Sequence, residues 1–333
     1  MRLTKKQWLQ VAVSLVVAVW IFWFLYKDIS FDALQRALSQ TSFFWFGLSI
    51  FVSMFGYWLR AWRWKLLIEA GEDQKSSTIN TFWALMIGYL ANLLVPRAGE
   101  VARCGVLKKM EDRQMGKLFG TVILERTIDL LFMAIIIFLA FLIERDLFVK
   151  LFSELVSLEA LEDKIKQSLP ILIGGVVVIL IFIYLVFQKY KDSSLFKKIR
   201  HFLRDLINGI ISLKKVENQL GFWGSSVVIW TAYYLTLLFM AWAVPSTASL
   251  SLSSILMVMV MGTIGMVAPV QGGIGTFHAL VAFILMAYGL SDEEGKIFAA
   301  ITHGSQVLIV ILLGLISLGF FFQITSRKES KSS

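Results

Sequence analysis

Nine apolar runs alternate with polar segments along the chain. Several approach or exceed the roughly 18 residues that mark a transmembrane helix, and the alternation over about ten residues that is typical of a membrane β-barrel strand is missing from the sequence. The pattern therefore predicts an all-α protein, a polytopic bundle of membrane helices. The runs are residues 8–26, 43–59, 79–95, 119–143, 170–187, 222–244, 254–268, 274–288 and 297–322.

Not all of these runs are expected to cross the membrane. About sixteen apolar residues precede Pro96, and at about 1.5 Å per residue they reach about 24 Å, short of a hydrocarbon core about 30 Å thick. We therefore predict that run 79–95 enters the membrane and returns through 96–107 as a re-entrant hairpin. Residues 254–288 are predicted to do the same from the opposite face.

The positions of Lys and Arg support this topology. With both hairpins re-entrant, 24 basic residues fall on the cytoplasmic side and 7 on the outer side, while Arg126 stays within the membrane. This asymmetry obeys the positive-inside rule. It predicts a multi-pass plasma-membrane protein with both termini in the cytoplasm. Run 8–26 is long and has no small-residue cleavage site after it, so it is expected to be a retained signal anchor.

The topology divides the chain, a single membrane domain over 1–333, into two halves. Residues 1–143 form the first half and 170–322 the second, each with about three spans and one hairpin. Because an odd number of spans precedes the second half, that half should be inverted relative to the first. The expected fold is thus a bundle with an inverted repeat.

A shared interruption supports the repeat. In each half a short apolar run is followed by a proline (Pro96, Pro269), then a glycine three residues later (Gly99, Gly272) and an apolar return. Paired interruptions of this kind often mark the binding site of a secondary transporter. Two simple helix kinks would give the same pattern, and that alternative stays open.

Composition and charge restrict the function. The net charge of +9 belongs to the cytoplasmic loops of a chain with 57% hydrophobic residues, and no basic soluble module that would bind nucleic acid is recognisable. The single cysteine, Cys104, and three widely separated histidines give no metal-ligand spacing. No phosphate-binding loop for ATP is present. We therefore expect no metal, no cofactor and no direct use of ATP.

Run 119–143 carries three charged residues. Glu125 and Asp129 are four residues apart and share a helix face, and Arg126 lies about 100° away. An ionised side chain at the centre of a span costs about 2.5–3.5 kcal/mol, so the three are expected to face the bundle interior and to have partners. They can form a structural ion pair or a relay for protons or headgroups, and both interpretations stay open.

The first predicted hairpin has the chemistry of an anion site. Pro96 suits the first turn of the returning helix, Glu100 is favourable near its N-terminus, and Arg97 occupies the tip. Exposed N–H groups together with Arg97 and Arg103 would bind an anion. Asn92 precedes the turn.

The second predicted hairpin has a glycine-rich tip followed by a histidine. Its glycines let the backbone approach a ligand closely. His278 can titrate near neutral pH, although a hydrogen-bonded packing role is the alternative. His303 lies in a polar island of the last run and is expected to face the same interior. The tip residues are Gln271, Gly272, Gly273 and Gly275.

Four motifs together resemble the lysylphosphatidylglycerol synthetase transmembrane-region family, known from the amino-terminal half of the multiple peptide resistance factor. The resemblance covers about residues 8 to 322. Family members typically have a glutamate where this chain has His278. The motifs are Arg60-x-x-Arg63-Trp64, Asn92-x-x-x-Pro96-x-x-Gly99-Glu100-x-x-Arg103, Glu125-Arg126-x-x-Asp129 and GGIGTF at 272–277.

The resemblance implies a lipid flippase. Its cargo would be an anionic or aminoacylated phospholipid, or a polyprenyl-phosphate-linked carrier, moved between leaflets. No aminoacyl-transferase domain is recognisable in the sequence, so a separate lipid-synthesising enzyme is a conceivable partner, as is a second copy in a homodimer. The residues expected to hold a headgroup or relay protons are Asn92, Arg97, Glu100, Arg103, Glu125, Arg126, Asp129, Gln271, Gly272, Gly273, Gly275, His278 and His303.

Two other classes of function remain compatible with the sequence. One is a membrane-embedded enzyme that acts on a lipid-linked sugar or phosphate, with Asp28 and Asp32 as its acids. The other is a non-catalytic protein that recruits a lipid synthetase through the basic segment 188–221.

Overall fold

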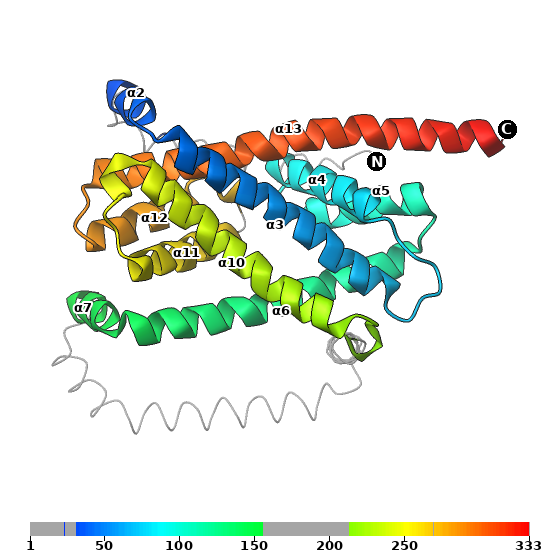
Figure 1. Cartoon of the computed structure of the whole chain (residues 1–333), viewed down its shortest axis with the longest axis horizontal. Helices are drawn as coiled ribbons and strands as arrows, with labels where there is room; N and C mark the ends of the chain where they lie inside the picture. Colours follow the sequence, from blue (N-terminus) through cyan, green and yellow to red (C-terminus); the bar gives the residue numbers. More distant parts are fainter. Residues whose placement is uncertain (1–22, 24–30, 156–212, 269, 333) are drawn as a thin grey trace, which may run out of the picture. The chain divides into compact units, whose positions relative to one another are not determined.

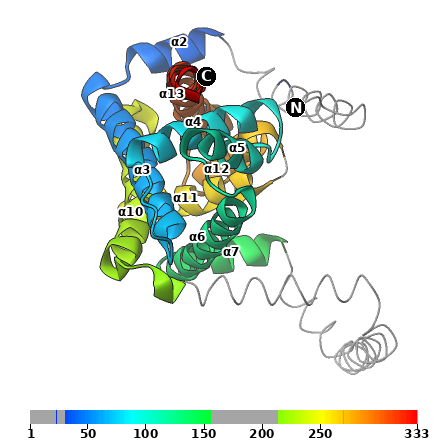
Figure 2. The same ribbon diagram turned by 90° about the vertical axis from the view of Figure 1, so that its right-hand side faces the viewer.

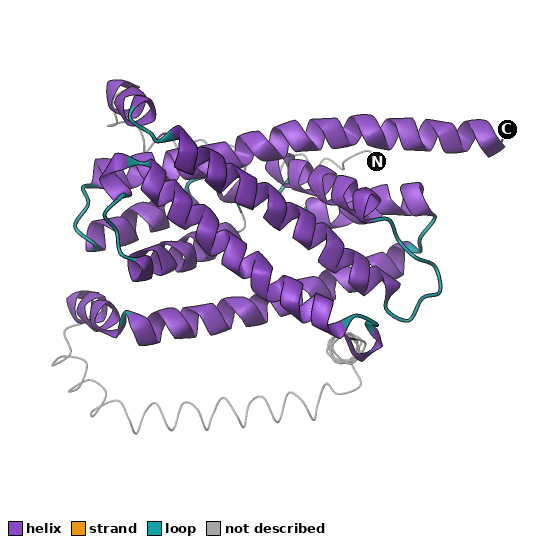
Figure 3. Ribbon diagram, viewed as in Figure 1, coloured by secondary structure: helices purple, strands orange, loops and turns teal. Residues whose placement is uncertain are grey.

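The described part of the chain is helical, as the sequence predicts (Figure 3). The computed structural model describes residue 23 and residues 31–155, 213–268 and 270–332. Within these ranges there is no strand. The helices are α2 (Phe31–Ser39), α3 (Phe43–Glu69), α4 (Thr78–Leu94), α5 (Gly99–Glu111), α6 (Met115–Ile143), α7 (Arg145–Leu155), α10 (Gln219–Ala243), α11 (Leu252–Val267), α12 (Thr276–Ala287) and α13 (Asp292–Ser332), with short 3-10 turns η1 (Leu213–Lys215), η2 (Pro245–Thr247) and η3 (Gln271–Gly273).

The chain divides into two compact units. The smaller one, Phe141–Ser212, contains α7, and in it the rings of Phe141 and Phe148 pack edge to face with centroids 5.3 Å apart. The larger unit consists of Met1–Ala140 and Leu213–Ser333.

Four described helices are long and apolar enough to cross a membrane: α3, α6, α10 and α13. They correspond to the predicted spans 43–59, 119–143, 222–244 and 297–322. The first of these continues further than predicted, because α3 ends only at Glu69. The predicted span 170–187, Pro269 and, apart from Trp23, the span 8–26 lie outside the described residues.

The described elements repeat one order. A long helix, two short helices and a long helix follow one another in α3 to α6 and again in α10 to α13. α3 runs alongside α10, and α13 packs on α4 (Figure 1, Figure 2). The division into two half-repeats, 1–143 and 170–322, and the inversion of the second half in the membrane stay predictions.

Each pair of short helices forms a hairpin that is closed by backbone contact. In the first hairpin, α4 and α5 approach so closely that a Cβ on Gly99 would overlap the carbonyl oxygen of Gly88. In the second hairpin, α11 and α12, a Cβ on Gly265 would lie 2.7 Å from the Phe277 Cα. The Thr276 hydroxyl donates to the Gly265 carbonyl at 2.7 Å. Small residues at these crossings allow two short helices to pack without a gap.

The tips of the two hairpins meet. The Gln271 side-chain amide on η3 donates to the carbonyl of Leu94, the last residue of α4, at 3.2 Å. Gly272 packs against Leu93, where an added Cβ would lie 2.9 Å from the Leu93 Cδ2. Glycine-rich backbone from the second half thus rests on the end of α4 from the first half. That both hairpins re-enter the membrane stays a prediction.

A pair of alanine substitutions in α5 tests the hairpin contact. Gly99→Ala forces the α4 and α5 backbones apart and should destabilise the fold by about 1–3 kcal/mol, seen as a lower midpoint of thermal unfolding in detergent. Gly105→Ala is the matched control, because nothing lies within 4 Å of a Cβ there. Equal midpoints for the two variants would contradict the close crossing.

Candidate functional site

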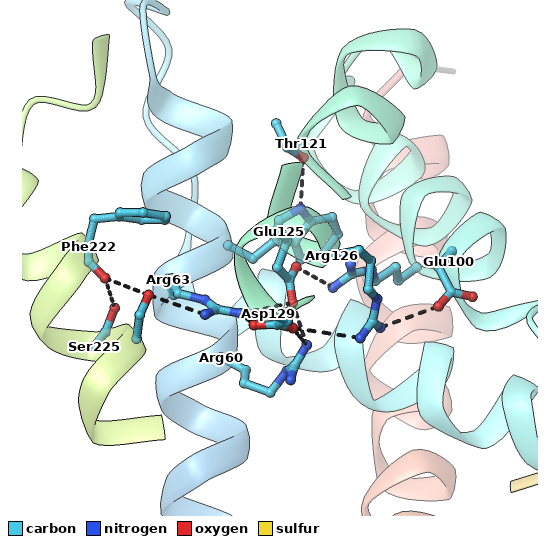
Figure 4. A network of polar contacts seen from close by, with 12 residues as sticks. Arg60, Arg63, Glu100, Thr121, Glu125, Arg126, Asp129, Phe222 and Ser225 are labelled. Atoms are coloured by element: carbon cyan, nitrogen blue, oxygen red, sulfur yellow. Dashed lines mark hydrogen bonds and ion pairs between the residues drawn. The ribbon is translucent and has the colours of Figure 1, made fainter. Parts of the chain in front are cut away.

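Charged side chains gather where α3, α5 and α6 pack together (Figure 4). Arg60 and Arg63 reach from α3, Arg103 from α5, and Glu125 and Asp129 from α6. We call these five residues the ion cluster. Both Arg63 and Glu125 are completely buried, and Arg103 is 2% exposed.

Glu125 is shared by the three arginines. Its Oε1 lies 2.6 Å from Nη2 of Arg60 and 3.6 Å from Nη2 of Arg63, and its Oε2 lies 2.9 Å from Nη1 of Arg103. The Glu125 carboxylate therefore joins its own helix, α6, to α3 and α5. Removing that carboxylate would leave three buried positive charges around it.

Asp129 completes the cluster one turn along α6. Its Oδ1 lies 2.5 Å from Nη2 of Arg63 and its Oδ2 lies 3.0 Å from Nη2 of Arg60. Arg60 thus bridges both carboxylates. The predicted common face of Glu125 and Asp129 is confirmed, and so is the expectation that they have partners inside the bundle.

The ion cluster carries more positive than negative charge. Its three arginines face two carboxylates, which leaves one net positive charge. The neighbouring pair Arg126–Glu100, 3.3 Å apart, adds none. Arg126 is also 3.8 Å from Asp129 and its side chain is 42% exposed, so it borders the cluster from outside. A buried net charge in an apolar surrounding is costly and favours the binding of a counter-ion.

Arg103 has one edge of its guanidinium unused. Its Nη1 faces Glu125, while Nε and Nη2 are buried without a hydrogen-bond partner among the described residues. The group lies over the Trp64 ring, 4.5 Å from the ring centroid. This cation–π contact holds the plane of the guanidinium in place. The cluster therefore offers two parallel N–H donors that no described residue accepts.

Polar side chains continue from the cluster along one face of α3. Ser49, Ser53, Tyr57, Arg60 and Arg63 follow one another at spacings of three or four residues, and we call them the polar stripe. The helical rise from Ser49 to Arg63 is about 21 Å, roughly two thirds of a typical hydrocarbon core. Polar groups therefore line α3 over most of the depth of a membrane.

Each member of the polar stripe has partners on other helices. On α13, Gln306 Oε1 accepts hydrogen bonds from Ser53 at 2.6 Å and from Tyr57 at 2.8 Å. On α10, the Tyr233 hydroxyl accepts from Arg60 Nη1 at 2.6 Å. The other contacts, also to α10, are Ser49 to the Thr236 carbonyl and Arg63 to the Ser226 hydroxyl. The stripe is thus enclosed by helices of the second half.

Two histidines that are distant in sequence meet at the second hairpin. His278 on α12 and His303 on α13 are both buried, and Nε2 of the first lies 3.4 Å from Nδ1 of the second. Nδ1 of His278 accepts from the Gly275 N–H at 3.1 Å, and Nε2 of His303 lies 2.9 Å from the Gly272 carbonyl oxygen. Gly272, Gly273 and Gly275 all have positive φ, a conformation that glycine adopts readily.

The first hairpin differs from the sequence prediction in its turn. Pro96 lies in the turn and not in the first turn of the returning helix, because α5 begins only at Gly99. Asn92 Oδ1 accepts the Gly99 N–H at 2.6 Å and so secures that start. Arg97 is exposed on the turn with φ of 60°, whereas Arg103 is buried in the ion cluster. Glu100 does lie in the first turn of α5.

Arg60 and Arg63 were missed as site residues. In the sequence they follow an apolar run next to two tryptophans, a pattern typical of a membrane interface. α3 continues past that point and carries both side chains into the interior. One feature points to them: they are three residues apart and so share a helix face, as Glu125 and Asp129 do.

Taken together, the fold and the ion cluster define a polytopic helical membrane protein with a buried, net positive polar site. The family model described as "Lysylphosphatidylglycerol synthase TM region" matches residues 11–314. The chain belongs to this family, which relates it to membrane proteins of lipid synthesis or flipping. Neither a search of curated proteins nor a search of solved structures gave a match.

Neutralising Glu125 tests the ion cluster. Glu125→Gln leaves three buried arginines with Asp129 alone and should destabilise the fold by about 3–5 kcal/mol. Glu100→Gln is the matched control, since its partner Arg126 is partly exposed. Thermal unfolding of both variants in detergent measures the difference, and a Glu125→Gln protein as stable as Glu100→Gln would contradict the shared carboxylate.

Proposed function

We propose that the protein moves a phosphate-bearing lipid between the leaflets of the plasma membrane, and that the ion cluster holds the lipid's phosphate during its passage. The observation that carries this proposal is the unused edge of Arg103 within a buried site of net positive charge. A lipid phosphate diester supplies one negative charge, which balances the cluster.

The unused edge of Arg103 suits an oxyanion that offers two oxygens, as a lipid phosphate does. The Nε–H and one Nη2–H lie along one edge of a planar guanidinium and point the same way, so they fit two oxygens of one phosphate. With Nη1 committed to Glu125 and the plane fixed by Trp64, this edge is preorganised. A lysine at this position would keep the charge and lose the two parallel donors.

The polar stripe supplies the path. A headgroup that leaves Arg103 meets Arg60, then Tyr57 and Ser53, without entering hydrocarbon, while its acyl chains stay in the lipid phase. Re-entrant hairpins at either end would shield the headgroup from the opposite aqueous phase. In this scheme the phosphate passes from the unused edge of Arg103 to side chains that already have partners, so these later positions do not bind it too tightly.

The embedded-enzyme alternative has less support among the described residues. Of its two candidate acids, Asp32 is exposed on α2 and Asp28 lies outside the described residues. The recruiting segment 188–221 of the third alternative lies outside them up to residue 212. Lipid movement is the function that we propose, because the described residues contain the ion cluster and the polar stripe.

The test is lipid translocation in proteoliposomes with Arg103→Gln. Because this variant removes the free N–H edge and the net charge together, the translocation rate should fall at least about tenfold. Lys109→Gln removes the same charge from an exposed position of the same helix and should leave the rate unchanged. The assay is run separately with three lipids: phosphatidylglycerol, its aminoacylated form and a polyprenyl phosphate.

Three results would count against the proposal. Folded wild-type protein that moves none of these lipids would reject lipid movement. Equal loss of rate in Arg103→Gln and Lys109→Gln would indicate a general effect of charge and not a phosphate site. Hydrolysis or glycosyl transfer by purified protein that Asp32→Asn abolishes would favour an enzyme instead.

A further inference from the structure

We infer that Thr236, Thr302 and Gln306 form a second, uncharged subsite of the headgroup path, and that this subsite takes the hydroxyl groups of a polyol or sugar headgroup. We call these three residues the hydroxyl subsite. They come from α10 and α13. The inference rests on the proposed function and deepens it by naming the class of headgroup that the lipid carries.

The two threonines differ from other threonines of the same helices. A threonine inside a helix often satisfies its hydroxyl by donating to a carbonyl one turn earlier. Thr231 on α10 and Thr325 on α13 do so, each at 2.9 Å. The hydroxyls of Thr236 and Thr302 are buried and have no hydrogen-bond partner among the described residues. Both side chains are therefore free to bond to another group.

Gln306 contributes a third unused group. Its Oε1 accepts from Ser53 at 2.6 Å and from Tyr57 at 2.8 Å, so this oxygen is occupied. Its Nε2 is buried without a hydrogen-bond partner in the described part of the chain. A buried donor that lacks an acceptor is costly. Three such groups on two helices therefore indicate a place for a ligand that supplies hydrogen bonds.

Contacts with α3 bring the hydroxyl subsite together. Ser49 donates to the Thr236 carbonyl at 2.8 Å, and Ser53, one turn further along α3, donates to Gln306. Thr302 lies four residues before Gln306 and so shares its face of α13. α13 also packs against both α3 and α10. The subsite therefore lies beside the serine end of the polar stripe.

The chemistry of the hydroxyl subsite suits a neutral, hydroxylated group. A threonine hydroxyl both donates and accepts, whereas the amide nitrogen of Gln306 only donates. Hydroxyl groups of a ligand can also do both, so they match all three members. The members are uncharged and offer an ammonium group no carboxylate. An aminoacylated headgroup therefore fits this subsite less well than a polyol or a sugar.

The polar stripe joins the hydroxyl subsite to the ion cluster. Tyr57, which donates to Gln306, lies three residues before Arg60 on α3, a rise of about 4.5 Å. On α10, Tyr233 accepts from Arg60 and lies three residues before Thr236. Both helices thus lead from the arginine to the subsite within about one helical turn. A phosphate at the ion cluster would leave its headgroup directed along this path.

The inference narrows the candidate cargoes. Phosphatidylglycerol, or a sugar linked to a polyprenyl phosphate, carries hydroxyl groups next to its phosphate. A bare polyprenyl phosphate has no headgroup hydroxyl, and an aminoacylated lipid adds a positive charge. A site that hydrogen-bonds hydroxyl groups rejects an analogue that lacks them, because the polar groups of the site are then left unpaired.

Lipids of equal charge that differ in headgroup hydroxyls test the inference. Phosphatidylpropanol has the phosphate diester of phosphatidylglycerol without its headgroup hydroxyls, and phosphatidylinositol carries a hydroxylated ring. Calorimetry with short-chain forms and the purified full-length protein in detergent measures the three affinities. The tighter-binding of the two hydroxylated lipids should bind at least about tenfold more tightly than phosphatidylpropanol, because it supplies the missing hydrogen bonds.

Thr236→Val and Thr302→Val each remove one hydroxyl at nearly constant volume. Each should lower this affinity ratio at least about threefold. Thr325→Val is the matched control on α13, because the Thr325 hydroxyl bonds to its own helix, and it should leave the ratio unchanged. Thermal unfolding separates binding from a structural role: a hydroxyl without a protein partner can be removed without lowering the unfolding midpoint.

The outcomes separate the hydroxyl subsite from the proposed function. Equal affinities for the three lipids in wild type, with binding still lost in Arg103→Gln, overturn the subsite and leave the phosphate site standing. An unchanged ratio in both threonine variants, or a lower unfolding midpoint in both, also overturns the subsite. If the folded protein binds none of the lipids, both proposals fail.

Discussion

One buried carboxylate organises the centre of this protein. Glu125 is fully buried and contacts arginines from α3 and α5, and so joins a long helix of the first half to the returning arm of the first hairpin. Ions taken out of water are costly, so such a cluster stays folded only when its charges are nearly balanced and well placed. In the ion cluster the positive charges exceed the negative charges by one. That excess supports the proposal that an anion completes the site.

The hairpins make the site possible. Gly88 and Gly99 bring α4 and α5 into backbone contact, and this crossing carries Arg103 inward from the start of α5. In the second hairpin, Gly265 allows the same close approach and leads into a tip that touches Leu94. Small residues thus place polar chemistry deep in an apolar bundle. That arrangement supports the proposal of a lipid substrate, which joins a polar headgroup to apolar chains.

Sequence reasoning reached the helical class, the four described spans and the inward face of Glu125 and Asp129, because these depend on local periodicity and on the cost of burying charge. The sequence did not reveal the arginines of α3 that pair with these two carboxylates. Arg60 and Arg63 have the composition of an interface, and only packing against α6 turns them into site residues. The meeting of His278 with His303 is equally non-local, since 25 residues separate them and no shared period links the two helices.

The decisive measurement for the proposed function is whether the ion cluster binds a lipid phosphate. The measurement is the affinity of purified protein in detergent for short-chain phosphatidylglycerol and for the corresponding neutral diacylglycerol, by calorimetry, in wild type and in Arg103→Lys. If the ion cluster is a phosphate site, only the phosphate-bearing lipid binds, and the lysine variant binds it at least about tenfold more weakly because two parallel donors are lost. Equal affinity for both lipids, or no change in Arg103→Lys, would contradict it.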